Sequence, residues 1–489
     1  MTRSSFWNLS GLAFMLALLS INIAAQSSAP DGPRPIINGA ENLTAVRADD
    51  TNQLQSAGPA EPSGPGMTLE QFVQMALANN PALGQARAAV NVAAGRTRQA
   101  GLWPNPTVGY MGEEIRGGSF GGGQQGAFIQ QNVILGGKLG LDRKIFSEEV
   151  KAAEAEADAE EIRVENGVRI AFYRALAEQQ MVEVRENLVA LAHDAVETTR
   201  QLFNVGQADQ PDVLEAQVEA DEAELAEITE QQEQESAWRV LASAAGKPGI
   251  ALSRLEGSLE SLPNLEADQV LQTILRDSPA VKIARLRVAK ADAELALAHR
   301  ELIPDLSVRA GYANNLEQLG TVPPKSVGSE GFAEVGVNLP LFNRNQGNIE
   351  AAQANHKRAS LEVQRVSLVL TQLAAPVLQG YASSRATANR YKARALPNAR
   401  RAYELYLARY REGAAAYPQV LISQRMLFEL ETKYIRALEN AWTNAAALQG
   451  LLLSDSIEPL ATRGEIDRSV PVGAEEICCF SAKQEERAR

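Results

Sequence analysis

The chain contains one pattern of segments twice, and this duplication limits the folds available to it. Residues 68–246 and 268–453 each begin with a short helical segment that ends just before a proline, Pro81 or Pro279. A second helical segment, two segments with strand periodicity and two long helical segments follow in the same order in both halves. Repeats of this size are typical of proteins assembled from repeated structural units rather than around one catalytic core. We therefore expect an internally duplicated α+β fold.

The strand-like segments follow a proline, Pro104 or Pro304, and alternate between apolar and polar residues. Such alternation predicts strands with one apolar and one polar face. The apolar positions are Pro106, Val108 and Tyr110, then Leu306, Val308, Ala310 and Tyr312, then Ala333, Val335, Val337, Leu339 and Leu341. In the remaining strand, over 127–135, Gln131 interrupts the apolar row.

Four strands of this kind suit a bilayer only if several copies of the chain combine. A tilted strand of roughly 9 to 11 residues crosses the hydrocarbon region. Four strands cannot close a barrel, because about eight strands form the smallest barrel with a well-packed interior. The longest uncharged helical stretch, 366–384, contains Gln372, Pro376 and Gly380. We therefore expect this helix to pack against other helices, and we expect strands to make the membrane contact.

The long helical segments, 141–205 and 348–412, would each run about 100 Å if they were continuous. A turn containing Gly206 or Gly413 follows each of them. Helices of this length are typical of coiled coils or tunnel walls. A soluble periplasmic coiled-coil scaffold or adaptor would explain the helices too, but it would not explain the duplicated strand pairs.

The remaining segments indicate export. Residues 1–25 have the charged start, short apolar run and small residues of a secretory signal peptide, and 26–66 has the composition of a flexible leader. The two repeats then span 67–250 and 251–453, and 454–489 is predicted to be a disordered tail. The formal net charge is -13, with no basic stripe carrying aromatic residues, so nucleic acid is an unlikely partner.

Residues that could carry chemistry are few, and we predict no enzyme and no cofactor. His193, His299 and His356 lie far apart on expected helices, where solvated positions are favoured over metal ligation. Cys478 and Cys479 are adjacent in the tail and supply too few ligands for a closed metal site.

Two junctions carry a resemblance to a known family. Residues 133–138 (VILGGK) and 339–349 (LPLFNRNQGNI) join a strand to a long helix. Together with the duplicated order of segments, they resemble the TolC-type outer-membrane efflux channels, in the cobalt-zinc-cadmium resistance branch. The resemblance implies a trimeric β-barrel with four strands per protomer, continued by a long α-helical periplasmic tunnel, in the outer membrane of a Gram-negative bacterium.

The resemblance also implies partners and a cargo. The partners are a periplasmic adaptor and an inner-membrane transporter of the resistance-nodulation-division type. Divalent metal cations are the expected cargo, with drugs or protein secreted by a type I route as the alternative. A soluble periplasmic coiled-coil scaffold or adaptor remains the alternative function from a different class of protein.

The helix turns are the predicted periplasmic entrance. Gly206 and Gly413 match the family's turn glycine, where the adaptor is expected to bind. A ring of acids from Asp209, Asp212 and Glu215 would attract cations in a narrow entrance. Acids in the first turn of a helix also offset the positive end of its dipole, and the two roles are compatible.

Overall fold

The computed structural model of the chain describes residues 66–115, 123–319, 325–412, 414 and 416–453. The chain divides into two compact units, Met1–Glu61 and Pro62–Arg489, and all described residues belong to the second. The predicted signal peptide, almost all of the leader, the tail with its two cysteines, and Gly413 lie outside the described residues.

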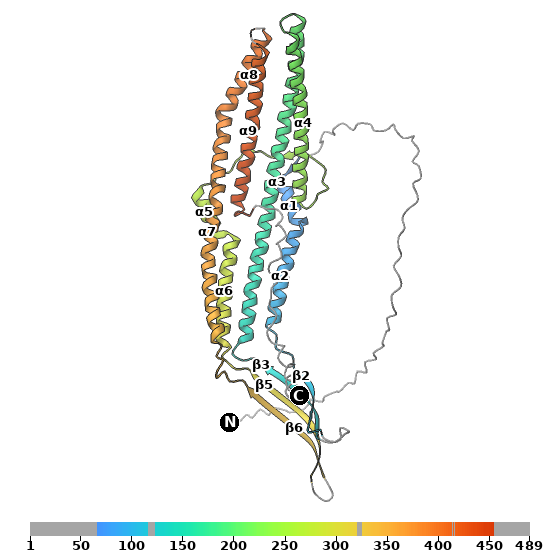
Figure 1. Ribbon diagram of the computed structural model, residues 1–489, viewed down its shortest axis with the longest axis vertical. Coiled ribbons are helices and arrows are strands. Elements are labelled where there is room, and N and C mark those ends of the chain that lie inside the picture. The colour runs from blue at the N-terminus through green and yellow to red at the C-terminus, as the bar shows by residue number, and fades with distance from the viewer. Residues whose placement is uncertain (1–65, 116–122, 320–324, 413, 415, 454–489) are drawn as a thin grey trace, which may run out of the picture. The chain divides into compact units, whose positions relative to one another are not determined.

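Four helices form the first half, in the predicted order (Figure 1). They are α1 (Leu69–Asn79), α2 (Pro81–Ala100), α3 (Lys138–Asn204) and α4 (Gln210–Ala244). Thr68 is the N-cap of α1, and its backbone N–H donates to the Gln71 side chain at 3.1 Å. The side chain of Asn80 accepts from the N–H of Ala82 at 2.9 Å, which caps α2. Polar caps thus start both short helices.

The second half follows the same order, except that its long helix is interrupted. Its elements are α5 (Ala267–Asp277), α6 (Pro279–Arg300), α7 (Gln346–Arg390), the π-helical turn η1 (Tyr391–Ala395), α8 (Leu396–Arg411) and α9 (Tyr417–Gln449). Pro397 lies at the start of α8 and has no N–H to donate to the carbonyl of Ala393. The backbone accommodates the missing hydrogen bond by widening into the π-helical turn η1. In the first half, α3 is one helix of 67 residues, about 100 Å long.

Strands from both halves form one antiparallel sheet in the order β2-β3-β5-β6. The strands are β2 (Thr107–Glu113), β3 (Gln124–Val133), β5 (Leu306–Leu319) and β6 (Lys325–Val337). The halves meet where β3 pairs with β5, from Gln124 opposite Asn315 to Val133 opposite Leu306. A short parallel pair, β1 (Met67–Thr68) with β4 (Leu255–Glu256), also links the two halves.

The prediction that β6 extends to Leu341 was wrong. The strand ends at Val337, and Leu339 and Leu341 lie outside it. Pro340 has no N–H and cannot continue a ladder of hydrogen bonds. The chain leaves the sheet there, and the Phe342 side chain beyond it is 92% exposed.

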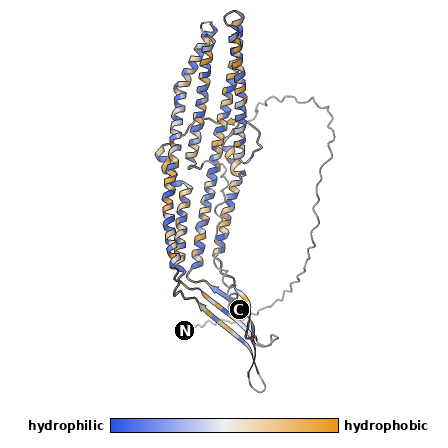
Figure 2. Ribbon diagram, in the orientation of Figure 1, coloured by the Kyte–Doolittle hydropathy of each residue, from blue (hydrophilic) through white to orange (hydrophobic). Residues whose placement is uncertain are grey.

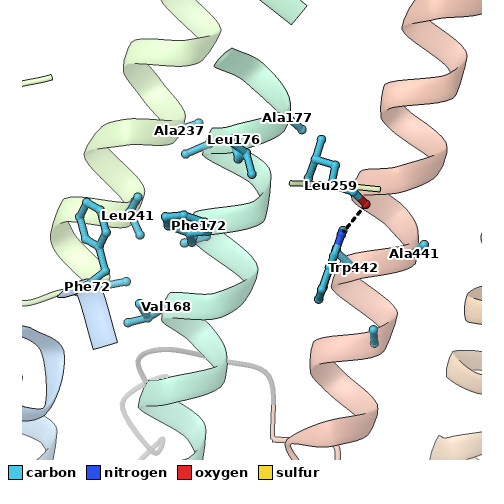
Figure 3. Packing of buried hydrophobic residues seen from close by; sticks show 14 of the residues in the cluster. Phe72, Val168, Phe172, Leu176, Ala177, Ala237, Leu241, Leu259, Ala441 and Trp442 are labelled. Carbon is cyan, nitrogen blue, oxygen red and sulfur yellow. Dashed lines mark hydrogen bonds between the residues drawn. The ribbon is translucent and has the colours of Figure 1, made fainter. Parts of the chain in front are cut away.

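Aromatic side chains form the centre of the hydrophobic core (Figure 3). The ring of Phe72 lies 6.0 Å from that of Phe172 and 5.7 Å from that of Trp238. Tyr173 stacks on Trp442 with 3.7 Å between ring centroids, so α3 and α9 are in direct contact. The indole N–H of Trp442 donates to the carbonyl of Leu259 at 2.8 Å. The core therefore joins the two halves of the chain.

The long helices mix hydrophilic and hydrophobic residues along their length (Figure 2). Within the described residues, no helix is long and apolar enough to cross a membrane. The uncharged stretch of α7 is buried in part: Leu370 and Ala374 are in the core, whereas Leu368 is 71% exposed and Leu373 is 52% exposed.

Candidate functional site

The turn between α3 and α4 is built around Gly206. Its φ of +75° is the left-handed conformation that glycine adopts without strain, and the N–H of the next residue, Gln207, donates to the carbonyl of Leu202 at 2.8 Å. The turn glycine expected from the sequence is thus a helix C-terminal cap. It allows α4 to return antiparallel to α3.

The three acids predicted for the entrance lie at this turn. Asp209 is the N-cap of α4, and its backbone N–H donates to the carboxylate of Asp212 at 3.1 Å. This contact is one half of a capping box, so Asp212 stabilises the start of the helix. Glu215 is exposed on the next turn. The structure therefore supports a capping role for Asp212 and leaves the Glu215 carboxylate facing solvent.

The second turn differs from the first. Helix α8 ends at Arg411, α9 begins at Tyr417, and the N–H of Ala414 donates to the carbonyl of Arg409 at 2.8 Å. Where α4 carries the acid Asp212, α9 carries the neutral Gln419. The three acids predicted for the entrance thus lie at the first turn, whereas the second turn carries Glu412, the C-cap of α8.

Contacts between the two helix hairpins were not predicted from the sequence. The hydroxyl groups of Thr199 on α3 and Tyr410 on α8 lie 2.9 Å apart and are buried. The Tyr410 ring lies 5.6 Å from that of Tyr417. Burial, together with the nearby Glu219 carboxylate, raises the pKa of Tyr417 to about 12, so this phenol is neutral.

An ion pair lies beside these tyrosines. The guanidinium of Arg425 on α9 contacts Glu219 on α4, with its Nε 3.0 Å from the carboxylate, and it lies 3.7 Å from Glu222. The two hairpins are therefore joined near their turns by a hydroxyl contact and by an ion pair.

The sheet has two chemically distinct faces, which follow from the strand register. Residues paired across neighbouring strands point to the same side. We define the polar face by Thr107, Gly109, Met111, Glu113, Gln124, Gly126, Phe128, Gln130, Asn132, Ser307, Arg309, Gly311, Ala313, Asn315, Gly328, Glu330, Phe332, Glu334 and Gly336. We define the apolar face by Val108, Tyr110, Gly112, Gln125, Ala127, Ile129, Gln131, Val133, Leu306, Val308, Ala310, Tyr312, Asn314, Ser329, Gly331, Ala333, Val335 and Val337.

Every charged side chain of these two sets lies on the polar face. They are Glu113, Arg309, Glu330 and Glu334. The apolar face exposes large hydrophobic side chains: Val108 is 74% exposed, Val335 66% and Tyr312 60%. Gln131 interrupts this face, as predicted, and its amide donates to the carbonyl of Pro104 at 2.8 Å. An exposed apolar surface of this extent marks contact with a membrane or another protein.

Two of the three histidines lie within hydrogen-bonding distance of a carboxylate. His193 Nε2 lies 2.9 Å from Glu224, and His356 Nε2 lies 3.0 Å from Asp292. His299 is in the last turn of α6, and the three histidines are on different helices. The structure does not bring them together, as the sequence predicts.

Among the described residues, one group of carboxylates meets the spacing of a metal site: Glu178, Glu230 and Glu233 have oxygen atoms within 4.8 Å of one another. Guanidinium groups already contact all three. Arg436 lies 2.6 Å from Glu178 and 3.4 Å from Glu233, and Arg185 lies 3.3 Å from Glu230. Burial, with a further contribution from Glu178, raises the pKa of Glu230. We interpret this group as an ion-pair network that is buried at Glu178 and Glu230 and exposed at Glu233.

Comparison with known proteins identifies relatives of this chain. A family model described as "Outer membrane efflux protein" matches residues 72–247 and 270–452, which is more than half of the chain. The cobalt-zinc-cadmium resistance protein CzcC of Cupriavidus metallidurans is 26% identical over 419 residues, which cover 84% of this chain and 96% of the relative. The nickel-cobalt-cadmium resistance protein NccC of Alcaligenes xylosoxydans xylosoxydans is 26% identical over 334 residues, which cover 66% and 70% of the two chains.

A similar fold is found among solved structures. The outer membrane protein VceC of Vibrio cholerae superimposes with a TM-score of 0.62 at 20% sequence identity, covering 78% of this chain and 96% of VceC. At this identity the likeness shows the fold alone. The fold is thus that of an outer-membrane protein with long helices.

Proposed function

The chain belongs to the outer membrane efflux protein family, and from this premise we propose that it is the trimeric exit channel of a tripartite system that exports divalent metal cations. The family and fold are those of channels in the outer membrane rather than of known enzymes. Beyond family membership, we propose the trimeric assembly, the two partner proteins and the metal cargo.

The separation of charge on the sheet carries the proposal. A strand that lines a water-filled pore through lipid needs one apolar and one polar face. All charged residues of the defined sheet faces lie on one side, and the exposed valines and tyrosines lie on the other. Strands β2 and β6 are the two edges of the sheet. Pairing these edges between three copies would give a closed barrel of twelve strands and would leave no unpaired edge.

Exposed apolar side chains on the helices support assembly as well. Leu214, Val218, Leu225 and Ile228 follow one stripe of α4, and each is more than half exposed in a single copy. A helix with such a stripe on its outer side is expected to pack against another helix. Neighbouring copies would bury this stripe in the wall of a shared tunnel.

The helix turns are the proposed entrance and adaptor contact. Asp209, Asp212 and Glu215 would form a ring of carboxylates from three copies, which attracts cations. The turns at Gly206 and Gly413 would contact the periplasmic adaptor. The adaptor would link the channel to an inner-membrane transporter of the resistance-nodulation-division type.

The cargo is proposed from the relatives. CzcC and NccC are named for resistance to cobalt, zinc, cadmium and nickel. Deletion of the gene should raise sensitivity to zinc, cobalt or cadmium, and should leave sensitivity to detergents and dyes unchanged. The reverse pattern would assign drugs as the cargo.

A separate experiment tests the assembly. The protein purified in mild detergent should have the mass of a trimer and should form channels in planar bilayers. A monomer recovered without detergent in a soluble periplasmic fraction would instead support the alternative that the protein is a soluble periplasmic scaffold or adaptor.

A further inference from the structure

Arg309 is the single basic residue of the polar face as we defined it, and one glutamate lies directly beside it. Glu334 on β6 lies directly opposite Arg309 on β5, and the shortest distance between guanidinium and carboxylate is 3.9 Å. Glu330 and Glu113 complete the charged set and lie further along the same face, opposite Ala313 and Gln124. The polar face is therefore acidic, with one fixed positive charge.

Two phenylalanines hold Arg309 in place. Its guanidinium carbon lies 4.2 Å from the ring centroid of Phe128 and 5.6 Å from that of Phe332. A guanidinium at these distances is attracted to the negative face of an aromatic ring. Phe128 is on β3 and Phe332 is on β6, so the two strands that flank β5 each supply one ring.

Glycines make room for both rings. A Cβ atom on Gly109 would lie 2.6 Å from the ring of Phe128, and one on Gly311 would lie 2.5 Å from the ring of Phe332. Each ring thus occupies the space that a side chain at the paired glycine of the neighbouring strand would need. The same Phe-over-Gly arrangement occurs on β2-β3 and on β5-β6, the strand pairs of the two halves.

The surface beside Arg309 is hollowed and polar. A hollow of about 280 Å³ is lined by Gln130, Asp305, Ser307, Arg309, Glu334 and Asn338, among others. The Lys138 ammonium donates a hydrogen bond to the Asp305 carboxylate at 3.0 Å. The Glu334 side chain is 68% exposed, and Arg309 is its closest basic neighbour among the described contacts. A cation moving along this face would therefore meet Glu334 together with Arg309.

We propose that Arg309 is a selectivity residue of the pore, which limits the cation preference set by the glutamates and keeps divalent cations from lodging at Glu334. This inference rests on the proposed function, because it requires that the polar face lines the pore. A conducting pore must attract its ion and also release it. Three Glu334 carboxylates, one from each of three copies, would hold divalent cations strongly if no positive charge were fixed beside them. Arg309 supplies that charge, and the two rings prevent it from turning away.

The experiment compares single-channel currents of the full-length protein and three variants in planar bilayers with a potassium chloride gradient. Arg309→Gln should raise the cation-to-anion permeability ratio by about twofold or more. It should also lower the zinc concentration that half-blocks the current by about tenfold. Glu334→Gln should lower the permeability ratio. Arg309→Lys is the matched control, because it keeps the charge, and its permeability ratio should stay close to that of the wild type.

The outcomes separate this inference from the proposed function. Channels of the Arg309→Gln variant with unchanged permeability ratio and unchanged zinc block would overturn the role of Arg309 and leave the channel proposal intact. If the Gln variant does not insert, an unchanged ratio in Glu334→Gln overturns the inference instead. Absence of channels from the wild-type protein would overturn the proposed function itself.

Discussion

Thr199 Oγ1 lies 2.9 Å from the Tyr410 hydroxyl oxygen, and this buried contact joins the α3–α4 hairpin to the α8–α9 hairpin. The Thr199 hydroxyl donates to the carbonyl of Ala195 on its own helix at 2.8 Å. Because a hydroxyl carries one hydrogen, Tyr410 is the donor in the contact between the hairpins. Removing the phenol hydroxyl therefore removes the contact without disturbing α3.

Tyr410→Phe should loosen the two hairpins near their turns. A typical net loss of about 1 kcal/mol for one hydrogen bond corresponds to a roughly fivefold larger equilibrium constant for local opening. Hydrogen exchange of the amides at the end of α8 measures this change.

Thr229→Val is the matched control for that experiment. Thr229 is exposed on α4, and its hydroxyl donates to the carbonyl of Leu225 on its own helix. Exchange at the end of α8 should not change in this variant. Equal exchange in wild type and Tyr410→Phe would show that the contact does not hold the hairpins together.

Trp442→Phe should destabilise the core. The carbonyl of Leu259 is buried and accepts from the Trp442 indole at 2.8 Å, so loss of the donor leaves it unsatisfied. The expected cost is about 1 to 3 kcal/mol. Denaturant unfolding in detergent, followed by near-ultraviolet circular dichroism, measures this cost. Trp103→Phe, at a side chain that is 58% exposed, should change the unfolding free energy by less than about 0.5 kcal/mol.

Local signals in the sequence predicted most of the fold. Thr68 and Asn80 are polar caps whose partners lie two or three residues away, so these helix starts depend on local sequence alone. The alternating apolar positions predicted the two faces of the sheet, because side chains alternate along a strand whatever its neighbours are. The sequence also contains Pro397, which removes one helical hydrogen bond. Its effect, a π-helical turn at Tyr391–Ala395, depends on how the neighbouring backbone rearranges around the missing bond.

The contacts that complete the sites could not be predicted, because they join residues far apart in the chain. Thr199 and Tyr410 are 211 residues apart, and their pairing depends on the packing of two hairpins. The same holds for Arg309, since Phe128 reaches it from a strand of the other half. The acids Asp209, Asp212 and Glu215 were identified from the sequence, but the hydrogen bond that involves Asp212 in helix capping needed the structure.

Substitutions at Asp212 and Glu215 should separate capping from cation attraction at the entrance. Glu215→Gln removes an exposed charge, so it should lower the cation preference of single channels and leave thermal stability unchanged. Asp212→Ala removes the partner of the Asp209 N–H and should cost about 0.5 to 2 kcal/mol of stability as well. Bilayer currents and unfolding curves measured on both variants check this separation. Unchanged selectivity in both variants would show that these acids act in helix capping and do not attract cations to the entrance.

Glu230→Gln should make the protein more stable at neutral pH. Burial raises the pKa of Glu230 above its usual value near 4.5, so the folded state holds its proton more tightly than the unfolded chain does. The resulting contribution to stability is complete below the unfolded pKa and is lost as pH rises through the folded pKa. Glutamine mimics the protonated form of Glu230. The difference in stability between the variant and the wild type should therefore be absent at pH 4 and should grow as pH rises.

Thermal unfolding of both proteins at several pH values between 4 and 8 measures that difference. Asp221→Asn, at an exposed position on the same helix, is the control and should show no such trend. A Glu230→Gln variant that is less stable than wild type at pH 8 would instead show that the ionised carboxylate is required by Arg185, which lies 3.3 Å away. In that case the ion pair, rather than the cost of burial, would dominate the energetics of Glu230.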